Sequence, residues 1–131
     1  MLKQVQHDKK IIMSLYSDII LDHYQFPRNN TKLKKSSAQI HVDNPLCGDS
    51  LDMEILEKDG KIKEIGFTGE GCAISIASAS LLTEYVKGKS KDEISKIDKD
   101  NVVGLLNIEL SPNRLKCALL AWEALIKLVK S

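Results

Sequence analysis

The fold of this chain is decided by LDMEILEKDGKIKEIGFT, residues 51–68. Leu51, Met53 and Ile55 alternate with acidic side chains, and this alternation is typical of a strand with one buried face. Asp59-Gly60 then predicts a two-residue hairpin turn, because glycine accepts the positive φ that a type I′ turn requires. The spaced apolar residues after the turn predict the return strand, so the stretch is expected to form an antiparallel hairpin.

One more strand is expected just before the hairpin. In residues 38–43, Ile40 and Val42 alternate with other side chains in the same way. The three strands together predict an antiparallel meander. Because the strands precede most of the helices, we expect an α+β domain, a small three-stranded antiparallel sheet with helices packed on one face.

Helical patterns surround the predicted sheet. In chain order, the expected helices run from about Lys10 to Pro27, from Gly71 to Val86, from a capping box of Ser90 with Glu93, and from Ser111-Pro112 onward. Residues 101–107 are expected to form a short helix or a turn. Residues 1–9 are expected to be a polar, flexible leader, and residues 10–131 a single domain.

Composition excludes several classes of protein. The 131 residues carry 19 basic and 18 acidic side chains, a net charge of +1, which lacks the basic excess of a nucleic-acid binder. No apolar run approaches the length that spans a membrane. The polar start, residues 1–10, has no secretory pattern, so we expect a cytoplasmic protein with reduced thiols. The odd number of cysteines, 3, also argues against a disulfide framework.

The three cysteines are the most informative residues for function. Cys47 and Cys72 each adjoin a glycine, and Cys117 follows a basic residue. Three thiols with one carboxylate, Asp49, would complete a four-coordinate site for zinc or iron. Their spacing is unlike that of a zinc finger, so the fold itself must bring these residues together.

The surroundings of two thiols favour their ionised form. Cys72 is expected at a helix N-terminus, where the positive end of the dipole stabilises a thiolate. Cys117 lies close to Arg114 and Lys116, which would favour a thiolate in the same way. On the last helix, at ~100° per residue, Cys117 falls on the order of 140° from the centre of the apolar stripe. It would then point away from its own helix's core residues, yet could still be buried against another element. The stripe consists of Leu115, Ala118, Leu119, Trp122, Leu125, Ile126 and Val129.

Plainer interpretations stay open for each of these residues. The cysteines could be ordinary half-buried thiols, and Asp49 taken alone is more typical of an Asx turn. Lys116 alone is more typical of a solvated side chain, and Arg114 of a residue near a helix start. The histidines are expected to be surface or hydrogen-bonded residues rather than ligands: His7, His23 and His41.

Several motifs occur together in a characteristic order. They are Leu15-Tyr16, Leu21-Asp22-His23-Tyr24, Pro27-Arg28-Asn29, Asn44-Pro45-Leu46-Cys47-Gly48-Asp49, Gly69-Glu70-Gly71-Cys72-Ala73-Ile74-Ser75, Ala77-Ser78-Ala79-Ser80 and Lys116-Cys117. Over residues 15–128 this set resembles the U-type iron–sulfur cluster assembly family, which includes IscU, SufU and the N-terminal part of NifU.

The resemblance implies a site and a partner. Cys47, Asp49, Cys72 and Cys117 would surround a zinc ion or a cluster, with Arg114 and Lys116 in support. The partner would be a cysteine desulfurase, with cluster carriers or apoproteins downstream. A thiolate would attack the donor persulfide, with Cys47 as the first choice for the acceptor and Cys117 as the second.

The subtype signals point in two directions. IscU-like scaffolds carry histidine before the third cysteine, whereas this chain has Lys116, as SufU-like proteins do. The run Glu70–Ser75 is also similar to SufU. The short interval between Cys72 and Cys117 instead resembles IscU. We expect a zinc-dependent sulfur acceptor, closer to SufU by motif and possessing sulfurtransferase activity. The alternatives are a non-enzymatic scaffold for a transient [2Fe–2S] cluster or iron, and a structural zinc-binding interaction module.

Overall fold

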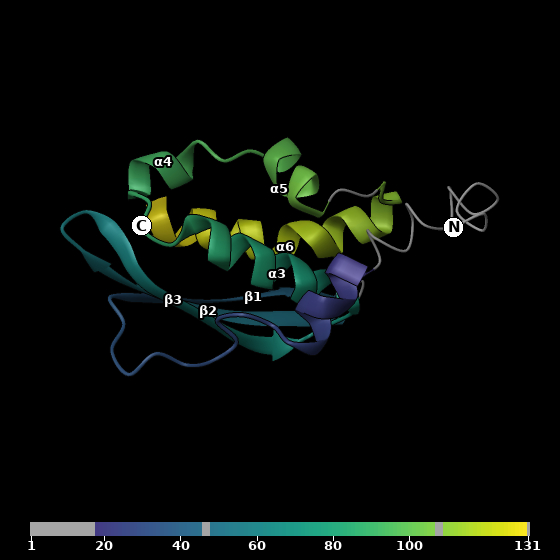
Figure 1. Cartoon of the computed structure of the whole chain (residues 1–131), viewed down its shortest axis with the longest axis horizontal. Coiled ribbons are helices and arrows are strands. Elements are labelled where there is room, and N and C mark those ends of the chain that lie inside the picture. Colours follow the sequence, from purple (N-terminus) through teal and green to yellow (C-terminus); the bar gives the residue numbers. More distant parts are fainter. Residues whose placement is uncertain (1–17, 46–47, 107–108, 131) are drawn as a thin grey trace, which may run out of the picture.

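The computed structural model describes most of the chain. The described residues are 18–45, 48–106 and 109–130. The expectations for the leader, for the first part of the N-terminal helix and for Cys47 lie outside these residues. Figure 1 shows a small sheet covered on one side by helices.

The sheet is a three-stranded antiparallel meander, as the sequence predicts. Its strands are β1 (Ala38–Asn44), β2 (Asp49–Lys58) and β3 (Lys61–Glu70), in the order β1-β2-β3. Asp59 and Gly60 form the turn between β2 and β3 with φ angles of 56° and 78°. Two positive φ angles match the type I′ turn that the Asp-Gly pair predicts.

The register of the hairpin places one face of each strand in the core. Leu51, Met53 and Ile55 of β2 have no exposed surface. On β3, Phe67 lies opposite Met53 and Ile65 opposite Ile55, so the apolar faces of the two strands coincide. Burial of these side chains stabilises the sheet through the hydrophobic effect.

Helices cover this apolar face. Residues 18–25 are helical, and the later helices are α3 (Ala73–Val86), α4 (Lys91–Ser95), α5 (Lys99–Leu106) and α6 (Pro112–Lys130). Figure 1 shows α3 and α6 side by side over the sheet. The capping box of Ser90 and Glu93 is present at α4, and Ser111 Oγ accepts a bond from Arg114 N–H at 3.4 Å at the start of α6. Among the described residues, no helix combines the length and the apolar character that crossing a membrane requires.

The buried face of α6 is wider than the predicted stripe. The stripe omits five buried residues, namely Cys117, Leu120, Ala121, Ala124 and Leu128. The reason is that α6 packs against β1 and β2 and also against α3, α4 and α5, so it is surrounded on more than one side. A single stripe predicts only the contact with one neighbour.

The segment before the sheet is held against α3 by polar contacts. His23 Nδ1 lies 2.7 Å from Ser80 Oγ, which also accepts a bond of 2.8 Å from the Arg28 backbone N–H. Asn29 Nδ2 donates to Thr83 Oγ1 at 3.0 Å. Burial lowers the pKa of His23 below its ordinary value of 6.5, and the nearby Arg28 guanidinium lowers this pKa further. His23 is therefore a hydrogen-bonded histidine, as expected.

Candidate metal centre

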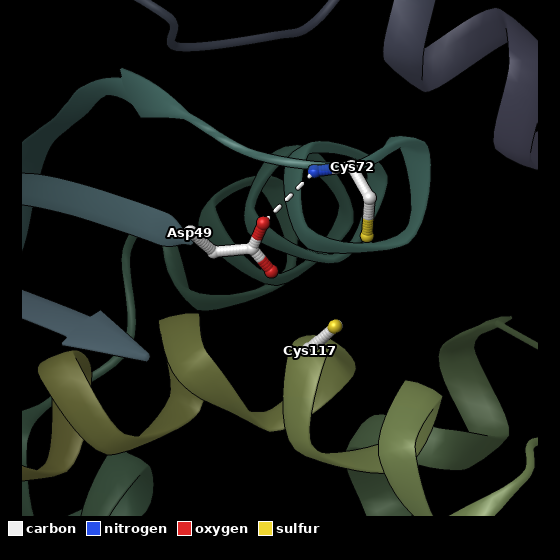
Figure 2. Close-up of side chains that lie close together, drawn as sticks. All are labelled: Asp49, Cys72 and Cys117. Carbon is white, nitrogen blue, oxygen red and sulfur yellow. Dashed lines mark hydrogen bonds between the residues drawn. The ribbon is translucent and has the colours of Figure 1, made fainter. Parts of the chain in front are cut away.

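Three elements bring their ends together at one place. Asp49 is the first residue of β2, Cys72 is the N-cap of α3, and Cys117 lies in the second turn of α6. The three ligand atoms, a carboxylate oxygen and two sulfurs, lie within 4.8 Å of one another. Figure 2 shows both sulfurs and the carboxylate directed toward a common point. The fold thus brings together three of the four residues expected from the sequence.

Asp49 is placed by the sheet and oriented by α3. Its side chain is only 3% exposed. Oδ1 accepts a bond of 3.1 Å from the backbone N–H of Cys72, and Oδ2 accepts one from the Ser75 hydroxyl. The interpretation of Asp49 as an Asx-turn residue is therefore wrong. Asp49 begins a strand, where it pairs with Asn44, and its carboxylate bonds to a different element.

Cys72 caps α3 with its backbone rather than with its side chain. Its φ and ψ of −72° and 171° are extended, and its side chain accepts no capping bond. The thiol is consequently left available, and Cys72 is exposed. Its Sγ lies 3.6 Å from Ser75 Oγ, so the site's oxygen and sulfur ligands share one neighbour. The expectation that Cys72 lies at a helix N-terminus is confirmed.

Cys117 reaches the site from the interior. It is 5% exposed and belongs to a small apolar cluster, separate from the main core, that includes Ile20, Ile74 and Leu106. The helix geometry placed it away from the predicted stripe, and it does pack against other elements. Burial and function are compatible here, because the sulfur still points toward Asp49 and Cys72 in Figure 2.

The other expected residues differ in what the structure says of them. Cys47 lies outside the described residues. Arg114 and Lys116 are exposed at the start of α6. His41 is on β1, where Nδ1 lies 2.9 Å from Asp52 Oδ1, and it is not among the residues of the site. His41 is an exposed, hydrogen-bonded histidine, as expected.

Ser75 and Gly71 also contribute to the site, although nothing in their motif predicted a separate role for either residue. Ser75 is fully buried and holds the Asp49 carboxylate. A Cβ on Gly71 would lie 3.1 Å from Asp49 Oδ1, so the absence of a side chain lets the carboxylate approach. A polar residue three positions after a helix N-cap is the available signal for Ser75. Its partner on β2 is not visible in the sequence.

The donor set suits a borderline or soft divalent metal. Two sulfurs and one carboxylate oxygen are ligands that zinc accepts in four-coordinate sites. Thiolates also favour zinc and iron over magnesium or calcium. The described residues supply three such donors within 4.8 Å, which fits a site completed by one more ligand.

Comparison with known proteins identifies relatives of two kinds. The NifU-like N-terminal domain family matches residues 15–131. The iron–sulfur cluster assembly scaffold protein IscU 1 of Archaeoglobus fulgidus is 40% identical over 111 residues, covering 85% of this chain and 72% of that protein. The zinc-dependent sulfurtransferase SufU of Bacillus subtilis is 34% identical over 131 residues, covering 87% and 88%.

Solved structures agree with the sequence matches. A protein from Fervidobacterium islandicum AW-1, assigned as an iron–sulfur cluster assembly scaffold for the SUF system, superposes with a TM-score of 0.76 at 27% identity. The match covers 88% of this chain and 97% of that protein. The expected family and fold class are confirmed. The preference for SufU over IscU stays a prediction, because relatives of both names match.

Proposed function

The chain belongs to the NifU-like N-terminal domain family, and on that premise we propose that it is an iron–sulfur cluster biogenesis protein that accepts persulfide sulfur at a zinc–thiolate site. The observation that carries this proposal is the convergence of Asp49, Cys72 and Cys117, whose ligand atoms lie within 4.8 Å. A relative at 34% identity is named a zinc-dependent sulfurtransferase, which supports the same chemistry.

Zinc would be held by Cys47, Asp49, Cys72 and Cys117, and it would keep their thiols deprotonated at neutral pH. Asp49 is the hardest of these donors, so it is the ligand expected to exchange most readily. Each carboxylate oxygen of Asp49 accepts one hydrogen bond, Oδ1 from the Cys72 N–H and Oδ2 from the Ser75 hydroxyl. A carboxylate oxygen has two lone pairs, so each oxygen keeps one for a metal.

The transfer step needs a thiolate and a persulfide donor, which a cysteine desulfurase would supply. The acceptor thiolate attacks the terminal sulfur of the donor's cysteine persulfide, and a new S–S bond forms on the acceptor. The donor's S–S bond breaks, and its cysteine leaves as a thiolate. Sulfur, hydrogen and charge are conserved, so the step requires no added oxidant or reductant.

Access to the thiols bears on which of them accepts sulfur. We propose Cys47 as the acceptor, since the glycine that follows it in the sequence permits the widest range of backbone conformations. Cys72 is exposed, whereas Cys117 is 5% exposed. Burial of Cys117 argues against direct attack by this residue on a protein-bound persulfide, despite its basic neighbours. Those neighbours, Arg114 and Lys116, are exposed and could attract an anionic donor instead.

A second candidate function is a scaffold for a transient [2Fe–2S] cluster. The specific observation in its favour is 40% identity to a protein named as a scaffold. The same cysteines and Asp49 would hold the cluster as cargo before its transfer to carriers or apoproteins. This function predicts a coloured protein with bound iron and sulfide after anaerobic reconstitution.

Alanine release by the cognate cysteine desulfurase, measured without iron, separates these functions. The assay compares the desulfurase alone, the desulfurase with zinc-loaded protein, and the desulfurase with the metal-free protein. Strong stimulation by the zinc-loaded protein, lost in Cys47→Ala, is the expected result. Absence of stimulation, together with stable cluster reconstitution, would replace this function with the scaffold function.

A further inference from the structure

Ser75 is a buried serine whose hydroxyl is committed to the site. It lies in the first turn of α3, three residues after Cys72, and none of its surface is exposed. A buried hydroxyl without a partner is costly. Ser75 avoids this cost by donating a hydrogen bond to Asp49 Oδ2. This bond joins a helix to the start of a strand.

The Asp49 carboxylate is fixed by two donors from the same turn of helix. The backbone N–H of Cys72 binds Oδ1 at 3.1 Å, and the Ser75 hydroxyl binds Oδ2. One donor alone would leave the carboxylate free to rotate about its terminal bond, whereas two donors on different oxygens define its plane. Gly71 leaves room for the carboxylate in this position, because a Cβ there would lie 3.1 Å from Oδ1.

We propose that Ser75 is a positioning residue that holds Asp49 as a preformed oxygen ligand beside Cys72 and Cys117. Ser75 itself need not bind the metal, because its hydroxyl already has a carboxylate partner. This inference rests on the proposed zinc–thiolate site and adds a determinant of its metal affinity. Groups that orient metal ligands typically contribute about 10- to 100-fold to affinity.

Ser78 provides a matched control for this proposal. It lies on the same helix, is 2% exposed, and donates a hydrogen bond of 2.6 Å to the carbonyl oxygen of Ala118. Ser75→Ala and Ser78→Ala therefore each remove one buried hydroxyl from α3, and Ser75→Ala also removes the contact of 3.6 Å with Cys72 Sγ. Both should lower the free energy of unfolding, because each removes a buried hydrogen bond to a partner on another element. Only Ser75→Ala should also disturb Asp49.

The experiment measures the zinc dissociation constant by competition with a chromophoric chelator. Variants are Ser75→Ala, Ser78→Ala, Asp49→Ala and the double variant of Ser75 and Asp49. Ser75→Ala should bind zinc about 10- to 100-fold more weakly than the wild type, with Ser78→Ala near the wild type. In the Asp49→Ala background, Ser75→Ala should have no further effect, because the two residues act through one interaction.

The possible outcomes separate this inference from the function on which it rests. Equal affinities for Ser75→Ala and Ser78→Ala would overturn the role of Ser75 and leave the zinc site intact. Unchanged zinc affinity in Cys72→Ala would instead show that zinc does not bind at this site, and would overturn the proposed function. If Ser75→Ala does not fold, Ser75→Thr keeps the hydroxyl and should bind zinc like the wild type. A folded Ser75→Thr with affinity as weak as that of Asp49→Ala would contradict the proposal.

Discussion

The backbone N–H of Cys72 donates a hydrogen bond of 3.1 Å to Oδ1 of Asp49, a residue 23 positions earlier in the chain. The bond joins the first residue of β2 to the N-cap of α3. The relative position of carboxylate and thiol is therefore set partly by the backbone. The candidate metal centre should be largely formed before a metal binds, and this has consequences for stability.

Replacing Asp49 should destabilise the metal-free protein. Asp49→Ala leaves the Ser75 hydroxyl and the Cys72 N–H without their acceptor, and a buried unsatisfied donor costs about 1–3 kcal/mol. Asp43→Ala, which removes an exposed carboxylate on β1, should change the free energy of unfolding by less than about 0.5 kcal/mol. Urea unfolding in the presence of a chelator measures both. Equal stability of the two variants would show that the Asp49 bonds contribute nothing.

The two described thiols should differ in reactivity. Cys72 is exposed and Cys117 is buried, so iodoacetamide should modify Cys72 first in the folded, metal-free protein. Modification of Cys117 should wait for local opening of the structure. Peptide mass spectrometry over time measures each rate, and zinc should slow both. Rapid modification of Cys117 under native conditions would mean that the apolar cluster around it does not protect it.

The parts of the fold that follow local patterns were predictable from the sequence. Alternation in residues 51–55 and the Asp59-Gly60 pair define the hairpin through strand period and turn conformation. The capping box at Ser90 is also a local signal. Such features depend only on residues a few positions apart, so no knowledge of the tertiary structure is needed.

The site was predictable in its residue types but not in its contacts. Cys72 at a helix N-terminus follows from the local sequence, whereas burial of Asp49 depends on β2 starting earlier than the apolar alternation indicates. The partner of Ser75 lies on another element, 26 positions away along the chain. Likewise, the burial of Cys117 results from the packing of α6 among several neighbours. These are tertiary contacts, which a single sequence does not display.

A methyl group at position 71 should disturb the site. The added Cβ in Gly71→Ala would lie 3.1 Å from Asp49 Oδ1 and 3.0 Å from Ser75 Cβ, so one of them must shift. We expect a loss of about 1–3 kcal/mol in the free energy of unfolding and weaker zinc binding. Gly104→Ala on α5 is the control, because nothing lies within 4 Å of its Cβ. Calorimetry with zinc titration compares them, and unchanged zinc affinity in Gly71→Ala would count against tight packing here.

Protonation of His23 should lower the stability of the folded protein in mild acid. Its pKa is lowered in the folded state by burial and by Arg28, so the folded protein favours the neutral ring. The unfolded chain then binds the proton more readily. The stabilising contribution of the neutral His23 ring is complete at a pH above its ordinary pKa of 6.5. This contribution is lost as the pH falls below that value. Thermal unfolding with a chelator present should show a steeper loss of Tm between about pH 7 and about pH 5.5 in the wild type than in His23→Gln. Identical slopes of Tm against pH in the two proteins would exclude His23 as a cause of the acid sensitivity.

Direct detection of transferred sulfur tests whether this protein accepts persulfide sulfur. A cysteine desulfurase is loaded with persulfide by its substrate cysteine, desalted and mixed with the zinc-loaded protein. Thiols and persulfides are then alkylated and peptides are identified by mass spectrometry. We predict one additional sulfur atom on a cysteine of the site, on the Cys47 peptide in the wild type and absent from Cys47→Ala. Persulfide that stays entirely on the desulfurase, with none on Cys47, Cys72 or Cys117, would contradict it.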